Sequence, residues 1–147
     1  VLGQRIDLPV LIAPVAALRM YHPDGALAVA RAAQKAGTIF VPSTSAYNSV
    51  EEIAAAILPC SWGYSEIGKM LEDRGLPTDS PLYARWIEMY ASDEFADLAA
   101  WLRDFVDRTA SSASEDNLRR MEEAFVSSSR YEYMFWDAAY LKEEWPV

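Results

Sequence analysis

The sequence has 147 residues, of which 52% are hydrophobic and 24% are charged, and its formal net charge is −9. This composition fits one ordinary globular domain and excludes a disordered chain. The negative charge argues against nucleic acid and anionic membranes as partners, and no apolar run is long enough to span a bilayer. The single cysteine excludes an internal disulfide, which predicts a reducing, cytoplasmic location.

Charge and aromatic residues are spread unevenly along the chain. The first 56 residues contain four basic and four acidic side chains, so they carry no net charge. All five tryptophans and the whole net negative charge lie after residue 56. This change predicts a boundary near residue 56, although no Pro-, Gly- or Ser-rich linker marks it.

The first part of the chain predicts alternating strands and helices. Apolar stretches at 8–16 and 38–42 are typical of short parallel strands that are buried on both faces. Between them, Pro23 and Asp24 open a helix that Gly37 closes. With the helix that follows residue 49, this order predicts a right-handed parallel β-α-β-α segment.

The second part of the chain predicts only helices. Ser49 and Glu52 match the S-x-x-E capping box, which opens a helix that runs to about Arg74 and ends at Gly75. Three further helices are expected to begin after Ser80, Ser92 and Ser114, with the last running toward Leu141. The predicted fold class is therefore mixed: a β-α-β-α domain over 1–55, then a helical half-domain over 56–147.

Pro59 interrupts the pattern of the helix expected over 49–73. A proline inside a helix costs ~3 kcal/mol, so a kink or a restart is expected at this position. A restart would place Cys60 in the first turn of a new helix. The helix dipole would then lower the pKa of the Cys60 thiol.

Residues 2–55 closely resemble the FMN-dependent α-hydroxy acid dehydrogenases and oxidases in the motifs LGQ, IAP, HPDG, AGT and SVEEI. That family forms a (β/α)₈ barrel of ~250 residues, so two strands can represent only a fragment of it. The resemblance implies FMN contacts at Ala13, Pro14, Val15 and Ala16, after the first strand, and at Ser43, after the second. The family's catalytic histidine comes from a later strand, whereas His22 lies in a loop before a helix. The alternative interpretation is that Pro14 and Ser43 are simply a strand end and a loop.

Residues 57–147 resemble the cysteine-containing branch of the thiaminase II (TenA) family. Three motifs carry the resemblance: LPCSWGYSEIG, SPLYARWIEMYASDEF and SSSRYEYMFWDAAYLKEEWP. The family hydrolyses thiamin, or the aminopyrimidine from degraded thiamin, to hydroxymethylpyrimidine for salvage. Its fold is an all-α, heme-oxygenase-like bundle that is usually a homotetramer. The resemblance therefore implies a small pyrimidine substrate, a homo-oligomer, and neither cofactor nor metal.

This resemblance assigns roles to five residues. It makes Cys60 the nucleophile and Glu132 the acid and base, with Tyr64, Tyr90 and Phe135 lining the pyrimidine pocket. A thiol is a good nucleophile once a base supplies the thiolate, and aromatic rings hold a flat heterocycle by stacking. The alternative interpretation is structural, because a lone cysteine is often an inert buried residue and aromatics at helical spacing usually form core.

The half of the TenA bundle that precedes the LPC motif has no counterpart here, including an aspartate that binds the aminopyrimidine. None of Asp7, Asp24, Glu51 and Glu52 is placed by the sequence to reach Cys60. We therefore expect a hydrolase with impaired or absent activity. The alternatives are a non-catalytic chimeric or structural protein and an FMN-binding fragment. The junction between the two patterns is expected at EEIAAA, residues 51–56, because both families have an alanine-rich helix there.

Overall fold

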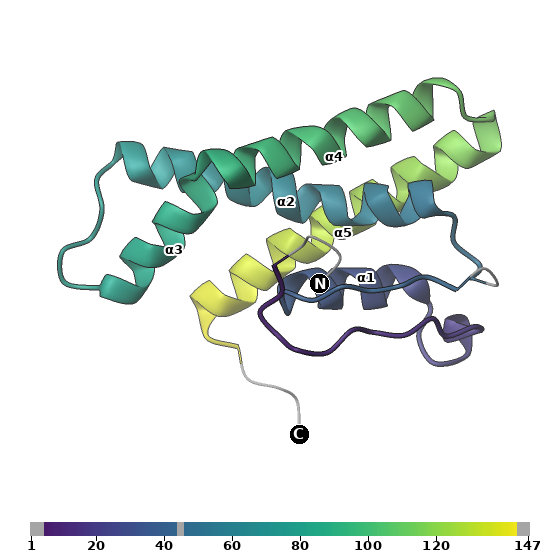
Figure 1. Ribbon diagram of the computed structural model, residues 1–147, viewed down its shortest axis with the longest axis horizontal. Coiled ribbons are helices and arrows are strands. Elements are labelled where there is room, and N and C mark those ends of the chain that lie inside the picture. The colour runs from purple at the N-terminus through teal and green to yellow at the C-terminus, as the bar shows by residue number, and fades with distance from the viewer. Residues whose placement is uncertain (1–4, 44–45, 144–147) are drawn as a thin grey trace.

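The described residues, 5–43 and 46–143 of the computed structural model, form helices and no named strand (Figure 1). A short 3₁₀ helix, η1 (Leu18–Met20), precedes the first α-helix. The α-helices are α1 (Ala26–Lys35), α2 (Val50–Asp73), α3 (Pro81–Ala91), α4 (Asp93–Ser111) and α5 (Glu115–Leu141). None of the helices in this described part is both long enough and apolar enough to cross a membrane.

Helix α2 is the centre of the bundle and packs against each of the other four α-helices. In Figure 1, α4 and α5 extend along α2, while α1 lies below it and α3 crosses one end. Small side chains make the close approach of α1, α2 and α5 possible. The largest buried cluster joins Ala26, Leu27 and Ala30 to Ile53, Ala56 and Ala124. A second cluster, Ala54, Leu58 and Leu102, joins α2 to α4.

The helix ends follow the local signals of the sequence closely. The hydroxyl oxygens of Ser49, Ser92 and Ser114 each accept a hydrogen bond from the backbone N–H three residues later, at 3.2 to 3.3 Å. These three predicted caps are confirmed, whereas the Ser80 side chain makes no capping hydrogen bond. Gly37 and Gly75, the predicted C-terminal glycines, have φ values of 61° and 95°, which favour glycine.

The predicted mixed fold class is wrong, because the described part of the chain contains no β-α-β-α segment. The two stretches expected as strands do lie side by side, but they share only one parallel bridge, between Ile12 and Phe40. Val10 and Val41 are 61% and 40% exposed. A parallel sheet is stable when helices cover both of its faces. Here α1 packs on α2 instead, and the stretches remain extended without forming a sheet.

The single helix expected over 49–73 is confirmed, whereas the restart expected at Pro59 is wrong. Helix α2 continues through this proline without interruption, so Cys60 lies in the helix interior rather than at a new N-terminus. Proline removes only its own N–H from the ladder of hydrogen bonds. The neighbouring turns are held by burial of Ala55, Ala56 and Leu58, which are at most 3% exposed. Tertiary packing therefore outweighs the local cost of the proline.

Helix α2 also runs through residue 56, where the composition of the chain changes. The division into domains 1–55 and 56–147 stays a prediction. Two parts of the sequence pattern lie outside the described residues. They are the LGQ motif at 2–4 and residues 44–45 of the loop that follows the second expected strand.

Candidate active site

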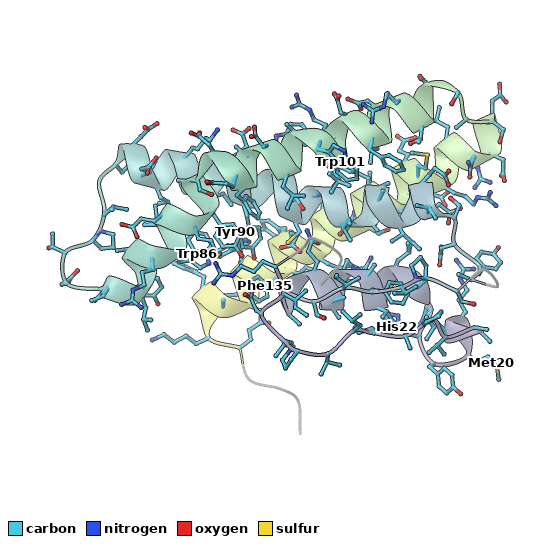
Figure 2. All side chains as sticks on the ribbon, viewed as in Figure 1. Met20, His22, Trp86, Tyr90, Trp101 and Phe135 are labelled. Carbon is cyan, nitrogen blue, oxygen red and sulfur yellow. The ribbon has the colours of Figure 1, made fainter. Side chains whose placement is uncertain are left out.

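A cavity of about 760 Å³ lies between α2, α3 and α5, with the end of α1 at one side. Four of the five residues assigned to the pyrimidine site line this cavity: Cys60, Tyr64, Tyr90 and Phe135. They come from three helices, and Figure 2 shows Tyr90 and Phe135 near Trp86 in this region. The structure thus brings together side chains that are up to 75 positions apart in the sequence. Their individual roles stay predictions.

Aromatic rings form the walls of the cavity. The ring of Tyr64 lies 4.9 Å from that of Tyr90 and 5.7 Å from those of Trp86 and Trp136, measured between centroids. Met70, Leu71 and Ile87 add apolar surface. A cavity with such walls favours a flat, mostly apolar ring. Trp136 was not singled out from the sequence, although its position next to Phe135 on α5 placed it near the site.

Glu132 lies beside the cavity rather than in its wall. It comes from α5, and its side chain is 12% exposed. Lys35 Nζ lies 3.1 Å from Glu132 Oε1, which makes an ion pair. Hydrogen bonding with this carboxylate contributes to the raised pKa values of Cys60 and Tyr64, so both side chains lie within its reach. A buried carboxylate that contacts a thiol, a phenol and an ammonium is typical of functional sites.

Burial raises the pKa of the Cys60 thiol to about 12, and the negative charge of Glu132 adds to this effect. The positive charge of Lys35 acts in the opposite direction. The sequence-based expectation of a lowered pKa is therefore wrong, because Cys60 is not at a helix N-terminus. Burial, followed by the charge of Glu132, also raises the pKa of Tyr64. At neutral pH both groups carry their protons, so a nucleophilic Cys60 needs a base.

Helix α1 supplies two polar residues to the cavity that the sequence analysis missed, Gln34 and Lys35. Gln34 Nε2 donates to Ser61 Oγ at 2.5 Å and to the Ile57 carbonyl at 3.4 Å. Its Oε1 is buried and accepts no hydrogen bond from a described residue. A signal was present in the sequence: Gln34 follows the buried residues Ala26 and Ala30 at four-residue spacing, so it belongs to the same helix face.

The residues implied as FMN contacts are not gathered in one cavity. Val15 and Ala16 line a hollow of about 470 Å³ near η1, but Ala13, Pro14 and Ser43 do not. Ala13 and Pro14 are exposed and Ser43 is half-buried. A barrel flavin site needs the ends of several parallel strands, and the described residues form no sheet. These residues therefore do not fit a flavin.

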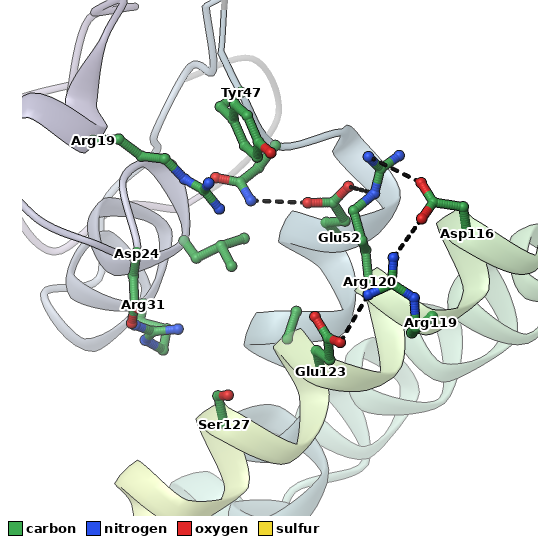
Figure 3. Close-up of a pocket in the computed structure, with 13 residues that line it drawn as sticks. Arg19, Asp24, Arg31, Tyr47, Glu52, Asp116, Arg119, Arg120, Glu123 and Ser127 are labelled. Carbon is green, nitrogen blue, oxygen red and sulfur yellow. Dashed lines mark hydrogen bonds and ion pairs between the residues drawn. The ribbon is translucent and has the colours of Figure 1, made fainter.

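A second hollow, of about 540 Å³, is polar and lies between α1, the start of α2 and α5 (Figure 3). Its central group is Glu52, whose side chain is 4% exposed. Asn48 Nδ2 donates to Glu52 Oε2 at 2.8 Å, and Arg120 Nε lies 3.0 Å from Glu52 Oε1. Neither here nor elsewhere in the described residues is a group of three or more His, Cys, Asp and Glu side chains arranged to hold a metal ion.

The helical fold and a cavity lined by aromatic rings and the half-buried Cys60, with a buried carboxylate beside it, define a class: the all-helical proteins with an aromatic ligand cavity. The particular family follows from comparison: residues 16–142 match the model of the TENA/THI-4/PQQC family. The chain belongs to this family. The match begins well before residue 56, so the family pattern extends over α1 as well as over the later helices.

Among known proteins, the chain is 40% identical to the aminopyrimidine aminohydrolase of Halalkalibacterium halodurans over 110 residues, which are 74% of this chain and 48% of the relative. It is 38% identical to the Bacillus subtilis aminopyrimidine aminohydrolase, covering 72% of this chain and 49% of the relative. The chain thus spans about half the length of these relatives. It is also 53% identical to glycolate oxidase 1 of Zea mays over 55 residues, which are 37% of this chain and 15% of that protein.

Proposed function

We propose that this chain carries a thiaminase II-type site that hydrolyses the C–N bond of an aminopyrimidine or of thiamin. In this proposal Cys60 is the nucleophile and Glu132 is the acid and base. One observation carries the proposal: Cys60, Tyr64, Tyr90 and Phe135 border a single cavity, and Glu132 is buried beside it. The family match and the aminopyrimidine aminohydrolase relatives support the same reaction class.

The raised pKa of Cys60, about 12, makes the role of Glu132 specific. As the attack begins, the Glu132 carboxylate takes the thiol proton and the sulfur bonds to a ring carbon of the pyrimidine. Glu132 then gives that proton to the departing amine, and the C–N bond to the exocyclic carbon breaks. Water adds to this carbon as Glu132 takes one of its protons, the C–S bond breaks, and Glu132 passes that proton to the sulfur. The net reaction consumes one water and releases one amine.

Binding of the ring is supported by the walls and by the polar end of the cavity. A pyrimidine can stack against the rings that line the cavity, among them Tyr64, Tyr90 and Phe135. The buried Oε1 of Gln34, which accepts no hydrogen bond from the described residues, offers an acceptor for a ring amino group. This acceptor comes from α1. The described residues among the first 55 contribute no carboxylate to the cavity lining, so Gln34 is the acceptor that this segment offers.

Release of hydroxymethylpyrimidine from aminopyrimidine tests the proposal. We expect turnover at least ~100-fold slower than that of the Halalkalibacterium halodurans relative, equivalent to losing one or two oriented contacts at ~1.4 kcal/mol per tenfold. Cys60→Ser should abolish this release, whereas Ser111→Ala, an exposed change on α4, should leave it unchanged. Product release that survives Cys60→Ser would contradict the assignment of the nucleophile.

The match to glycolate oxidase favours a second candidate, a chimeric chain without catalytic activity that joins two sequence patterns within α2. A source DNA that encodes residues 1–55 and 56–147 in different reading frames or genes would support this candidate. For the flavin alternative, purified protein should show visible flavin absorbance. Colourless protein that gains none when mixed with FMN would remove that alternative.

We also propose that the chain self-associates. The support is the apolar surface of α5, where Tyr133, Met134 and Tyr140 are 72%, 59% and 85% exposed. Exposed apolar patches beyond a few hundred Å² usually mark interfaces. Light scattering should give a mass above that of one 16.5 kDa chain. A monodisperse monomer would contradict this part of the proposal.

A further inference from the structure

Lys35 occupies a special position among the basic residues of the chain. It is the last residue of α1, and its Nζ lies 3.1 Å from Glu132 Oε1 on α5. The same Nζ lies 4.5 Å from the centre of the Phe135 ring. Lys35 also lines the large cavity, in which it is the only cationic residue among those described. The ammonium group of Lys35 therefore contacts Glu132 and the Phe135 ring, and it also borders the cavity.

The titratable and charged groups that act on Cys60 and its neighbouring tyrosines come from four of the helices around the cavity; α4 contributes only the uncharged Phe95 to its lining. Glu132 lies on α5, Lys35 on α1, Tyr64 on α2 itself and Tyr90 on α3. Both tyrosines keep their protons at neutral pH, because burial raises the pKa of each. The charge of Asp7 also raises the pKa of Tyr90. The charge balance at Cys60 is therefore set by one anion and one cation.

We propose that Lys35 is a positioning residue of this site, which holds the Glu132 carboxylate against the cavity and counters its negative charge at Cys60. The inference deepens the proposed function and rests on its assignment of Cys60 and Glu132. Without Lys35, the negative charge shared by Glu132 and Cys60 would be buried with no compensation, wherever the proton lies. With Lys35, the proton can pass from Cys60 to Glu132 while the cluster keeps a net charge of zero.

This role connects the N-terminal segment to the chemistry. The ammonium reaches Glu132 because α1 packs along α2 through small residues, and its C-terminal end then lies beside α5. Lysine is suited to such a role because its compact charge carries three donors. Its charge lies 3.1 Å from Glu132 Oε1, and its donors also border the cavity, where they can contact a ligand.

Alkylation of Cys60 by iodoacetamide tests the inference separately from hydrolysis. Cys60 is the only cysteine in the sequence, so the modified product is unambiguous. Lys35→Met keeps the length of the side chain and removes its charge. We expect it to alkylate about fivefold more slowly at a fixed pH between 8 and 10, because losing a nearby cation lowers the thiolate population. Lys35→Arg should restore most of the rate.

The matched control is Lys69→Met, which removes an exposed lysine of α2 that does not line the cavity. Its alkylation rate should equal that of the unmodified chain. Circular dichroism melting curves identify any variant that does not fold, and Lys35→Gln then replaces Lys35→Met as the neutral variant. Equal rates for the neutral Lys35 variant and the control would overturn the inference. So would a Lys35→Arg variant as slow as Lys35→Met, because the effect would then come from shape rather than charge.

A double-mutant cycle separates positioning of Glu132 from a direct effect on the thiol. If Lys35 acts partly through Glu132, the rate ratio for Lys35→Met should change in the Glu132→Gln background. An unchanged ratio would overturn the positioning role. If hydrolysis is undetectable in every variant but the alkylation pattern holds, the proposed function fails and the role of Lys35 in the charge balance stands.

Discussion

Two buried carboxylates of the described residues, Glu52 and Glu132, are partnered in different ways. Glu52, at the start of α2, accepts a hydrogen bond from Asn48 Nδ2 at 2.8 Å and pairs with Arg120 at 3.0 Å. Glu132, near the end of α5, pairs with Lys35 at 3.1 Å, and hydrogen bonding with it contributes to the raised pKa values of Cys60 and Tyr64. The comparison teaches that a carboxylate held by an asparagine and an arginine fixes a junction between helices. A carboxylate beside a thiol and a phenol is available for chemistry.

The largest expected effect comes from removing the Glu52 carboxylate. Glu52→Leu should lower the free energy of unfolding by about 3 kcal/mol, because Asn48 would be left buried without its partner and Arg120 without its counterion. The exposure of Arg120, 40%, limits the loss on that side of the pair. Urea unfolding followed by circular dichroism measures this change.

Two matched variants accompany this measurement. Glu72→Leu, an exposed position on the same helix, should change stability by less than about 0.5 kcal/mol. Glu132→Leu should lie within about 1 kcal/mol of the unmodified chain, because it removes the cost of burying a charge and because the counterion Lys35, 38% exposed, can be hydrated instead. A loss at Glu132 as large as that at Glu52 would show that the two carboxylates are equally structural.

A second variant disturbs the cavity next to Glu132 and leaves the Glu52 junction intact. Gly68 lies where α2 meets α3, and a Cβ there would come within 2.6 to 2.8 Å of Tyr90 and Ala91. Gly68→Ala should therefore push α3 away and cost about 2 kcal/mol of unfolding free energy. Tyr90 would move with α3, so the cavity should change as well.

Gly63→Ala is the matched control for Gly68→Ala, because a Cβ at this helical glycine would meet nothing within 4 Å. It should stabilise the chain by up to about 1 kcal/mol, since alanine is the better helix former. Urea unfolding compares the two variants. If Gly68→Ala is as stable as Gly63→Ala, the close packing of α2 against α3 is wrong.

The smallest expected effect concerns the reactivity of Cys60. The Glu132 charge contributes to the raised pKa of this thiol, about 12, so Glu132→Gln should lower that pKa. Below the pKa, the thiolate population rises as the pKa falls. Alkylation at pH 8 to 9 should then become about threefold to tenfold faster. The sign is opposite to that expected for hydrolysis, which Glu132→Gln should reduce.

Alkylation rates between pH 7 and 11 measure this effect, with Glu52→Gln as the control. The Glu52 carboxylate does not contribute to the raised pKa of Cys60, so its removal should leave the alkylation rate unchanged. Slower alkylation in Glu132→Gln would mean that the carboxylate activates the thiol even before substrate binds.

Much of the helical part was predictable because its signals are local. Ser49, Ser92 and Ser114 accept the hydrogen bonds that their positions before helices predict, and Gly75 ends α2 as expected. The candidate site residues Cys60, Tyr64, Tyr90 and Phe135 were named from motifs, and the structure brings them to one cavity. The spacing of the motif residues along each helix predicts which of them share a helix face. It does not predict the chemical role of each residue.

The failures occurred where distant residues decide the outcome. The stretches around Ile12 and Phe40 have the composition of buried strands, but a strand needs further strands and covering helices that this part of the chain does not provide. The capping-box carboxylate, Glu52, accepts a hydrogen bond from Asn48, directly before its own helix, and also pairs with Arg120 of α5, which no local pattern predicts. In both cases the outcome depends on residues that are far away in the sequence.

The sequence by itself determined where the helices after residue 49 begin and which residues carry reactive groups, because caps, glycines and periodicity act over a few residues. Only the tertiary structure decided that α1 packs on α2 and brings Lys35 to Glu132. It also decided that Cys60 lies in an unbroken helix with a raised pKa. The physical reason is that burial and charge pairing depend on which surfaces meet, and no local pattern records the distance between α1 and α5.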